Sequence, residues 1–156
     1  MQHSDWHSMN ISIAMATHNG HKHLEKQLKS LLHQTLLPRE IVISDDGSTD
    51  GTCALLDFYA REYGFIKILN SKSSGVNENF QNAVSACRGD HIAFCDQDDI
   101  WEKDKLAQLA ARFSNGILLA YGKSILIDYG DRQLPLVTED YLGFRRYRDG
   151  HVPFYF

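Results

Sequence analysis

The sequence contains only three cysteines and three prolines among its 156 residues. Cys53, Cys87 and Cys95 lack the spacing of a metal site, and an odd number of cysteines does not fit a disulfide framework. No apolar run approaches the roughly 20 residues that a membrane-spanning helix needs. The first ten residues lack the basic and apolar segments of a secretory signal. We therefore expect reduced thiols, no transmembrane segment and a cytoplasmic location.

Positive charge is also not in excess, since the formal net charge of the chain is -4. Proteins that bind the phosphate backbone of nucleic acids usually carry a basic surface, so nucleic acid is not the expected partner. Hydrophobic residues make up 43% of the chain and charged residues 23%, which is typical of a folded globular protein. A chain of this length is expected to form one domain.

Short apolar segments alternate along the chain with segments of helical period. The strand candidates are residues 11–16, 40–44, 65–69, 91–95, 117–121 and 124–128. The helix candidates are residues 21–34, a segment from a cap at Ser48 or Thr49 up to Gly64, and residues 77–87 and 102–113. Apolar strands separated by helices predict an α/β fold with a mostly parallel sheet and helices on both faces.

The regular pattern is lost at both ends of the chain. Residues 1–10 are polar and without period, which predicts a tail, and residues 11–128 form the predicted domain. Residues 129–156 are aromatic and basic without a clear period, which predicts an incomplete C-terminal segment. A compact chain rarely ends on exposed residues such as VPFYF. We therefore expect that the chain is cut from a longer protein or that this segment packs on a partner.

Acidic residues follow two of the predicted strands. Asp45 and Asp46 end one strand, and Asp96, Asp98 and Asp99 follow another. The carboxyl ends of parallel strands share one edge of the sheet, where ligands bind in open α/β folds. Two unit charges about 6 Å apart repel by roughly 2 to 3 kcal/mol at an effective dielectric near 20. A group that compensates this repulsion is therefore expected at this edge.

A hard divalent cation meets that requirement, because Mg²⁺ and Mn²⁺ prefer carboxylate and water ligands. Residues two apart in an extended segment lie on the same side, so Asp96 and Asp98 can face one ion. The ion would also neutralise a diphosphate substrate and its leaving group. The sequence has no G-x-x-x-x-G-K-[ST] loop and no G-x-G-x-x-G after the first strand, so ATPase and dinucleotide-binding interpretations lack their phosphate loops.

Simpler interpretations stay open for each motif. An isolated Asp-x-Asp is often a solvated loop, and Asp-Asp-Gly-Ser is often a turn before a helix. His18, His21 and His23 suggest a zinc site, but their H-x-x-H-x-H spacing is not a standard ligand pattern. Cys87 and Cys95 fit small core side chains better than reactive thiols. The occurrence of both acidic motifs at predicted strand ends favours a ligand site.

Three segments occur in order along the chain, namely ISIAMATHNG, IVISDDGSTDGT and SSGVNENFQNAVSACRGDHIAFCDQDDIW. As a set, from Ile11 to Asp128, they resemble the nucleotide-binding half of a family-2 glycosyltransferase with the GT-A (Rossmann-like) fold. The FCDQDDIW form is similar to a bacterial branch of rhamnosyltransferases and other surface-polysaccharide enzymes. The resemblance implies metal-dependent, inverting transfer of a sugar from a UDP- or dTDP-sugar to an acceptor hydroxyl, with Mn²⁺ or Mg²⁺ as cofactor.

The resemblance also assigns roles to single residues on the donor side. Thr17, Asn19 and Asn79 would contact the nucleotide. Asp45 would accept a hydrogen bond from the imide N–H of the base, and Asp46 would lie beside it near the ribose.

On the metal and acceptor side, the resemblance makes Asp96 and Asp98 the metal residues. Asp98 would ligate the ion directly, and Asp96 would hold the ribose or a metal-bound water. Asp99 and Trp101 would shape the acceptor side. The family places its general base downstream, where Asp140 belongs to the only acidic pair that remains. This pair comes earlier than in the family pattern, so the resemblance predicts that the acceptor half is absent.

Two functions stay open from the sequence. The first is a glycosyltransferase present as its donor-binding portion, and the second is a non-catalytic nucleotide-sugar-binding module that works with a partner chain. A nucleotidyltransferase would need a glycine-rich basic loop after the first strand, which is missing. The expected partners are a nucleotide-diphosphate sugar and a saccharide or lipid-linked saccharide acceptor, with a homo-oligomer or partner chain left open. A lipid-linked acceptor would place the protein peripherally at the inner face of the membrane.

Overall fold

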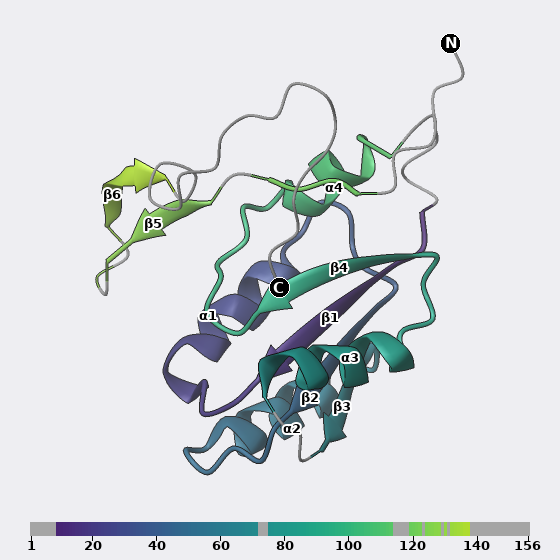
Figure 1. Cartoon of the computed structure of the whole chain (residues 1–156), viewed down its shortest axis with the longest axis vertical. Coiled ribbons are helices and arrows are strands. Elements are labelled where there is room, and N and C mark those ends of the chain that lie inside the picture. The colour runs from purple at the N-terminus through teal and green to yellow at the C-terminus, as the bar shows by residue number, and fades with distance from the viewer. Residues whose placement is uncertain are drawn as a thin grey trace. The chain divides into compact units, whose positions relative to one another are not determined.

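The computed structural model describes residues 9–71, 75–113, 119–122, 124–128, 130 and 132–137. The chain divides into two units, Met1–Ala120 and Tyr121–Phe156, and each is described by itself. Strands and helices alternate through the first unit (Figure 1). In chain order they are β1 (Ile11–Thr17), α1 (His21–Leu32), β2 (Glu40–Asp45), α2 (Thr52–Glu62), β3 (Ile66–Asn70), α3 (Val76–Ala86), β4 (His91–Asp96) and α4 (Lys105–Ala110). The predicted α/β alternation is confirmed.

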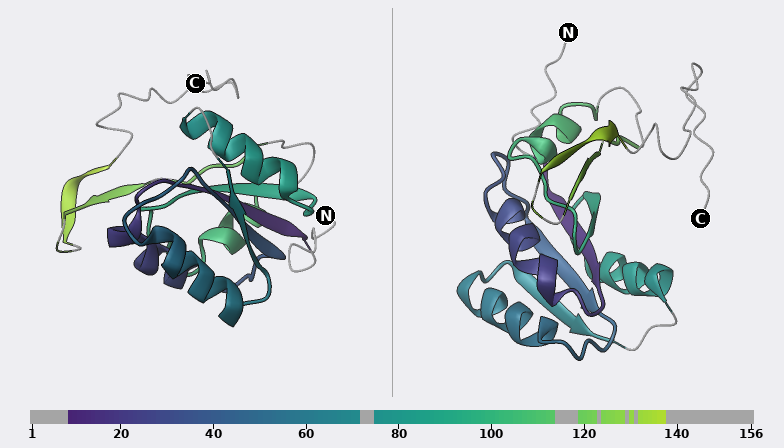
Figure 2. Two further views of the ribbon diagram at one scale, coloured as in Figure 1. Left: turned by 90° about the horizontal axis from the view of Figure 1, so that it is seen from below. Right: turned by 90° about the vertical axis from the view of Figure 1, so that its left-hand side faces the viewer.

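The four strands of this unit form one parallel sheet in the order β3-β2-β1-β4. All residues of β1 and β2 are buried, as expected for apolar strands in a parallel sheet that is covered on both sides. Helices α1 and α2 cover one face of the sheet, and α3 covers the other (Figure 2). The predicted mostly parallel sheet with helices on both faces is therefore confirmed.

Two hydrophobic clusters hold the layers together. The larger cluster joins alternate residues of β1, such as Ile13 and Met15, to the buried leucines of α1 and to Leu56 of α2. The smaller cluster consists of Ala14, Val42 and Ala83 on the side of α3. Residues of opposite parity along β1 thus pack on opposite faces, which fixes the strand between two helical layers.

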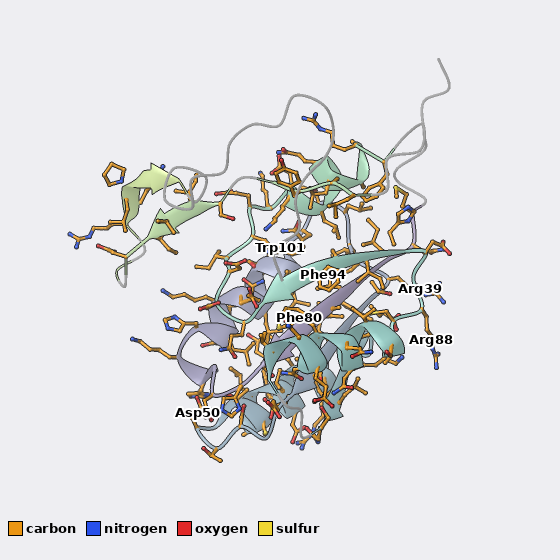
Figure 3. All side chains as sticks on the ribbon, viewed as in Figure 1. Arg39, Asp50, Phe80, Arg88, Phe94 and Trp101 are labelled. Carbon is orange, nitrogen blue, oxygen red and sulfur yellow. The ribbon has the colours of Figure 1, made fainter. Side chains whose placement is uncertain are left out.

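The outer strand β4 is less well covered than β1 and β2. Phe94 is 61% exposed and Ile92 is 38% exposed. The ring of Phe94 packs edge-to-face on Phe80 of α3, with the ring centroids 5.6 Å apart (Figure 3). Within the described sheet, β4 pairs only with β1, so its second edge has no strand partner among the described residues.

The prediction of the residue that caps the second helix is wrong. A cap at Ser48 or Thr49 was expected from the sequence, but α2 begins at Thr52 with Gly51 as its N-cap at φ 97. The Ser48 hydroxyl instead donates to the carboxylate of the last residue of β2, at 2.6 Å. Asp50 accepts from the backbone N–H of Thr52 at 3.1 Å, so a contact inside the loop replaces the expected cap.

Other predicted elements differ in length or lie outside the described residues. The helix expected at 102–113 is limited to α4, and the strand expected at 117–121 lies partly outside the described residues, while 119–121 is not a strand. In the second unit, β5 (Ile125–Ile127) lies in the strand expected at 124–128 and pairs antiparallel with an unpredicted strand, β6 (Gln133–Val137). The predicted limits of the tail, the domain and the C-terminal segment stay predictions. No helix in the described ranges has the length and hydropathy that spanning a bilayer requires.

Gly89, between α3 and β4, marks a close approach of two backbone segments. A Cβ at this position would lie 2.6 Å from Ser12 N and 2.8 Å from Asn10 O, so β1 or its neighbour would have to shift. We predict that Gly89→Ala lowers the free energy of unfolding in urea by about 1–3 kcal/mol. Gly64→Ala is the control, because nothing lies within 4 Å of its added Cβ. Equal stability of the two variants would contradict the close approach.

Candidate functional site

The register of the sheet brings three loops to one edge. Thr17 at the end of β1 pairs with Asp45 at the end of β2, and Ala16 pairs with Asp96 at the end of β4. The segments that follow these strands therefore start side by side. Since α1 and α3 lie on opposite faces, the strand order reverses at β1, where open α/β sheets bind ligands.

Side-chain hydrogen bonds join the β1–α1 loop to the β2–α2 loop. Asn19, which has a left-handed φ of 50, donates its backbone N–H to Ser48 Oγ at 2.8 Å. The Oδ1 atom of Asn19 accepts from the backbone N–H of Thr49, also at 2.8 Å. Gly20 N donates to Thr52 Oγ1 at 2.9 Å. Asn19 therefore holds the two loops together. The nucleotide contact that the family resemblance implies for Asn19 stays a prediction.

The carboxylate of Asp45 is buried and accepts hydrogen bonds at both oxygens. Its Oδ2 accepts from Thr17 Oγ1 at 2.9 Å and from Ser48 Oγ at 2.6 Å, and its Oδ1 accepts from Ser48 N at 2.9 Å and from Cys53 Sγ at 3.4 Å. Burial by itself would raise the pKa of Asp45, but these hydrogen bonds together lower it below its ordinary value. Asp45 is 1% exposed, and its carboxylate joins the end of β1 to the β2–α2 loop.

Asn79, near the start of α3, brings a third segment to the same place. Its Nδ2 donates to the backbone oxygen of Thr17 at 3.0 Å, and the residue is 3% exposed. Its Oδ1 is buried and accepts no hydrogen bond from the described residues. A buried acceptor of this kind normally has a donor, so this oxygen is suited to a ligand or a water molecule.

The segment after β4 carries carboxylates that repel one another. Desolvation by neighbouring residues, followed by repulsion from Asp99 and Asp98, raises the pKa of Asp96. Desolvation also raises the pKa of Asp99, although Lys105 acts in the opposite direction. These residues, 96–99, are called the acidic turn. The turn differs from Asp45, because desolvation and like charges act on its carboxylates, whereas hydrogen-bond donors surround Asp45.

This donor set fits a divalent cation that is shared with a phosphorylated ligand. In the described part of the chain, no three or more His, Cys, Asp or Glu side chains are grouped as a complete metal site. Mg²⁺ is usually held by only one or two protein carboxylates, with water and phosphate oxygens completing its shell. Asp96 and Asp98 meet that smaller requirement, and a cation would offset the repulsion within the turn.

Gln97 links the acidic turn to the β1–α1 loop, a contact that the sequence-based predictions missed. Its Oε1 accepts from the backbone N–H of His18 at 2.9 Å, and its Nε2 donates to the backbone oxygen of His18 at 3.2 Å. The Nδ1 atom of His18 in turn donates to the backbone oxygen of Asp46 at 2.8 Å. The only signal in the sequence was the position of Gln97 between two aspartates at a strand end.

The family described as "Glycosyl transferase family 2" matches residues 12–154. The chain belongs to glycosyltransferase family 2. Its relatives include the dTDP-rhamnosyl transferase RfbG of Shigella flexneri, which is 36% identical over 135 residues, covering 76% of this chain and 47% of the relative. This relative agrees with the predicted rhamnosyltransferase-like branch.

Solved glycosyltransferases share the GT-A fold of this family-2 chain. TarS 1–349 of S. aureus in complex with UDP is 30% identical, with a TM-score of 0.58, over 66% of this chain and 31% of the TarS 1–349 chain. The mannosyltransferase PcManGT of Pyrobaculum calidifontis, in complex with GDP-Man and Mn²⁺, has a TM-score of 0.63 and 21% identity over 77% of this chain and 36% of PcManGT. The chain spans less than half the length of each of these three proteins.

Of the remaining predicted site residues, Trp101 is buried and Asp140 lies outside the described residues. Trp101 (labelled in Figure 3), which was expected on the acceptor side, is 4% exposed and belongs to the larger hydrophobic cluster. The Lys105 ammonium lies 4.5 Å from the centroid of its ring. Its acceptor-side role stays a prediction. Asp140, the candidate base, lies outside the described residues.

The histidine and cysteine alternatives gain no support in the described ranges. His21 and His23 are exposed on α1, and no metal-type cluster includes them among the described residues. Cys95 is buried and accepts a hydrogen bond from Gln27 at 2.7 Å, and burial strongly raises the pKa of its thiol. Burial likewise raises the pKa of Cys87. Both thiols therefore favour the protonated form, in line with a packing role.

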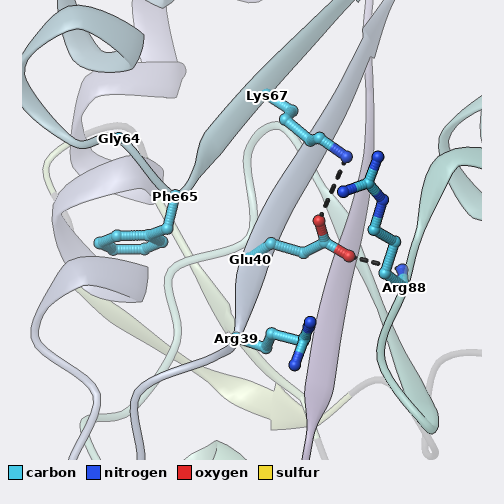
Figure 4. Close-up of a pocket in the computed structure, with 6 residues that line it drawn as sticks. All are labelled: Arg39, Glu40, Gly64, Phe65, Lys67 and Arg88. Carbon is cyan, nitrogen blue, oxygen red and sulfur yellow. Dashed lines mark hydrogen bonds and ion pairs between the residues drawn. The ribbon is translucent and has the colours of Figure 1, made fainter.

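A cavity of about 320 Å³ lies at the opposite, amino-terminal edge of the sheet (Figure 4). It is lined by Arg39, Glu40, Gly64, Phe65, Lys67 and Arg88. Glu40 accepts from Ser12 Oγ at 2.8 Å and forms an ion pair with Lys67 at 3.4 Å, so the carboxylate is held inside the protein. The cavity shares no residue with the loops described above.

The pKa of Asp45 predicts an acid-dependent contribution to stability. Because the folded-state pKa is lowered, the ionised carboxylate stabilises the fold above about pH 4, and this stabilisation is lost as pH falls through the folded-state pKa. We predict that Asp45→Asn lowers the free energy of unfolding at pH 7 by about 1–3 kcal/mol. Urea denaturation between pH 3 and pH 7 should also show a flatter pH dependence for the variant. Parallel pH profiles for variant and wild type would contradict the role of this carboxylate.

Proposed function

We propose that the chain is the donor-binding portion of a metal-dependent, inverting glycosyltransferase that uses a UDP- or dTDP-sugar in bacterial surface-polysaccharide synthesis. The supporting observation is that three loops converge on one edge of the sheet, with a hydrogen-bonded polar centre beside an acidic turn. The rhamnosyltransferase relative and the UDP complex of TarS support the choice of donor.

The polar centre is proposed to hold the nucleotide. Thr17, Asn19 and Asp45 fix the loops by the contacts described above, and Asn79 offers its buried Oδ1 as an acceptor for a ligand donor. The family resemblance assigned the contact with the imide N–H of the base to Asp45. Because both oxygens of Asp45 already accept hydrogen bonds, we assign that contact to Asp46, which follows it in the loop and is only half-buried.

The acidic turn is proposed to hold the metal end of the donor. Asp98 would ligate Mn²⁺ or Mg²⁺, and Asp96 would bind the ribose or a metal-bound water. The bound cation would supply charge neutralisation for the leaving diphosphate. Asp99 remains the proposed acceptor-side residue. The structure with GDP-Man and Mn²⁺ supports use of a divalent cation, since it shares the fold of this chain.

Transfer also requires a general base within hydrogen-bond reach of the acceptor hydroxyl. Asp140 stays the candidate on sequence grounds. A saccharide or lipid-linked saccharide is the proposed acceptor, which fits a cytoplasmic protein or one peripheral to the inner face of the membrane.

The alternative function is a nucleotide-sugar-binding module that works with a partner chain. The short coverage of the relatives keeps this alternative open. Donor hydrolysis or transfer assayed with Mn²⁺ separates the two functions. Turnover by the wild type that is lost in Asp98→Asn supports the transferase, whereas nucleotide binding without turnover favours the module.

Ligand binding can be measured as thermal stabilisation by UDP, dTDP and GDP, with and without Mn²⁺. We predict stabilisation by UDP or dTDP that requires Mn²⁺, of roughly 2.7 kcal/mol at 100 times the dissociation constant. Asp98→Asn should lose the Mn²⁺-dependent part. Asp57→Asn, the same change at an exposed position on α2, should keep it. Stabilisation that is equal for Asp98→Asn and wild type would count against the metal assignment.

A further inference from the structure

We propose that Gln97 is a positioning residue that couples the metal-binding turn to the base-binding loop through His18. This inference rests on the proposed function, because it assumes a cation at Asp98 and a base near Asp46. Gln97 lies between the two proposed metal residues, yet its side chain is directed to the loop after β1.

The geometry of this contact is that of a continued strand pair. The ladder between β1 and β4 ends at Ala16 and Asp96. One step further, the side-chain amide of Gln97 offers one acceptor and one donor, and both are used by the backbone of His18. The Gln97 side-chain amide therefore takes the place of a backbone peptide group at the point where the segments that follow β1 and β4 separate. Among the described residues, the two hydrogen bonds of the Gln97 amide are the only ones between the acidic turn and the β1–α1 loop.

His18 connects the acidic turn to the β2–α2 loop, because its ring contacts the backbone of Asp46. Because the backbone oxygen of Asp46 can only accept, Nδ1 of His18 must donate in their 2.8 Å contact. The neutral ring then accepts at Nε2 from Asn19 Nδ2, at 3.1 Å. A displacement of the acidic turn on cation binding would thus move His18, and with it the Asp46 segment.

Gly20 provides a second way to test the contact. A Cβ at Gly20 would overlap the Gln97 amide, and its backbone φ of -96 accommodates alanine. The overlapping group is the end of a flexible side chain, so Gly20→Ala should displace Gln97 without disturbing the fold. Gln97→Met removes both hydrogen bonds at similar volume. Gln81→Met, at an exposed position on α3, is the matched control.

The first measurement uses the protein without ligand. In Gln97→Met and Gly20→Ala, the backbone N–H of His18 should exchange with solvent about 3- to 10-fold faster than in wild type. The control variant should match the wild type. Unchanged exchange at His18 in both variants would overturn the contact, independently of any nucleotide or metal.

The second measurement uses uridine and thymidine, which carry no phosphate through which to bind a cation directly. In wild type, Mn²⁺ should raise the affinity for one of these nucleosides about fivefold or more, and this ratio should approach one in both variants. If Mn²⁺ leaves the nucleoside affinity of the wild type unchanged although the wild type binds UDP, the proposed coupling is overturned and the proposed function is not. A wild type that binds neither UDP nor dTDP with Mn²⁺ overturns the proposed function, and the coupling with it.

Discussion

The parallel register of β1 with its two neighbours is the constraint from which the site follows. Pairing of Thr17 with Asp45 and of Ala16 with Asp96 brings the loops after β1, β2 and β4 to the same edge of the sheet. The register itself depends on Ile13 and Met15 packing on one face and Ala14 on the other. Since a shift by one residue would exchange these faces, the same packing that stabilises the sheet also aligns the polar strand ends.

Carboxylates at this edge have two different environments. Asp45 is surrounded by donors and stabilises the loops when ionised. Desolvation, together with repulsion from neighbouring carboxylates, raises the pKa values of Asp96 and Asp99, so their ionised forms cost stability when no cation is present. Hydrogen-bond donors around a carboxylate, as at Asp45, stabilise the conformation of a loop. Carboxylates without such donors, as in the acidic turn, retain affinity for a cation. Gln97 holds the acidic turn to the β1–α1 loop through its uncharged amide, so it leaves the negative charge of the turn unchanged.

Much of the fold could be predicted from the sequence, because buried strands such as residues 11–16 are apolar at nearly every position. The strand-end aspartates could be located in the same way. The hydrogen bonds that Asp45 accepts could not be predicted, since its donors Thr17 and Ser48 come from the end of β1 and from the β2–α2 loop. Burial of Trp101 beside α1 is likewise a matter of tertiary packing. The start of α2 was missed because local contacts of Ser48 and Asp50 replaced an ordinary cap.

The second edge of β4, which pairs with no strand among the described residues, has a consequence for the behaviour of the protein in solution. In the described part of the chain, this edge presents backbone groups without a strand partner, next to the exposed side chains of Ile92 and Phe94. Such an edge is a template on which other chains can assemble. Self-association through this strand would grow with protein concentration and would be favoured by conditions that strengthen apolar contacts. Polar replacements on the outer face of β4, away from the loops that hold the proposed site, offer a route to a better-behaved sample.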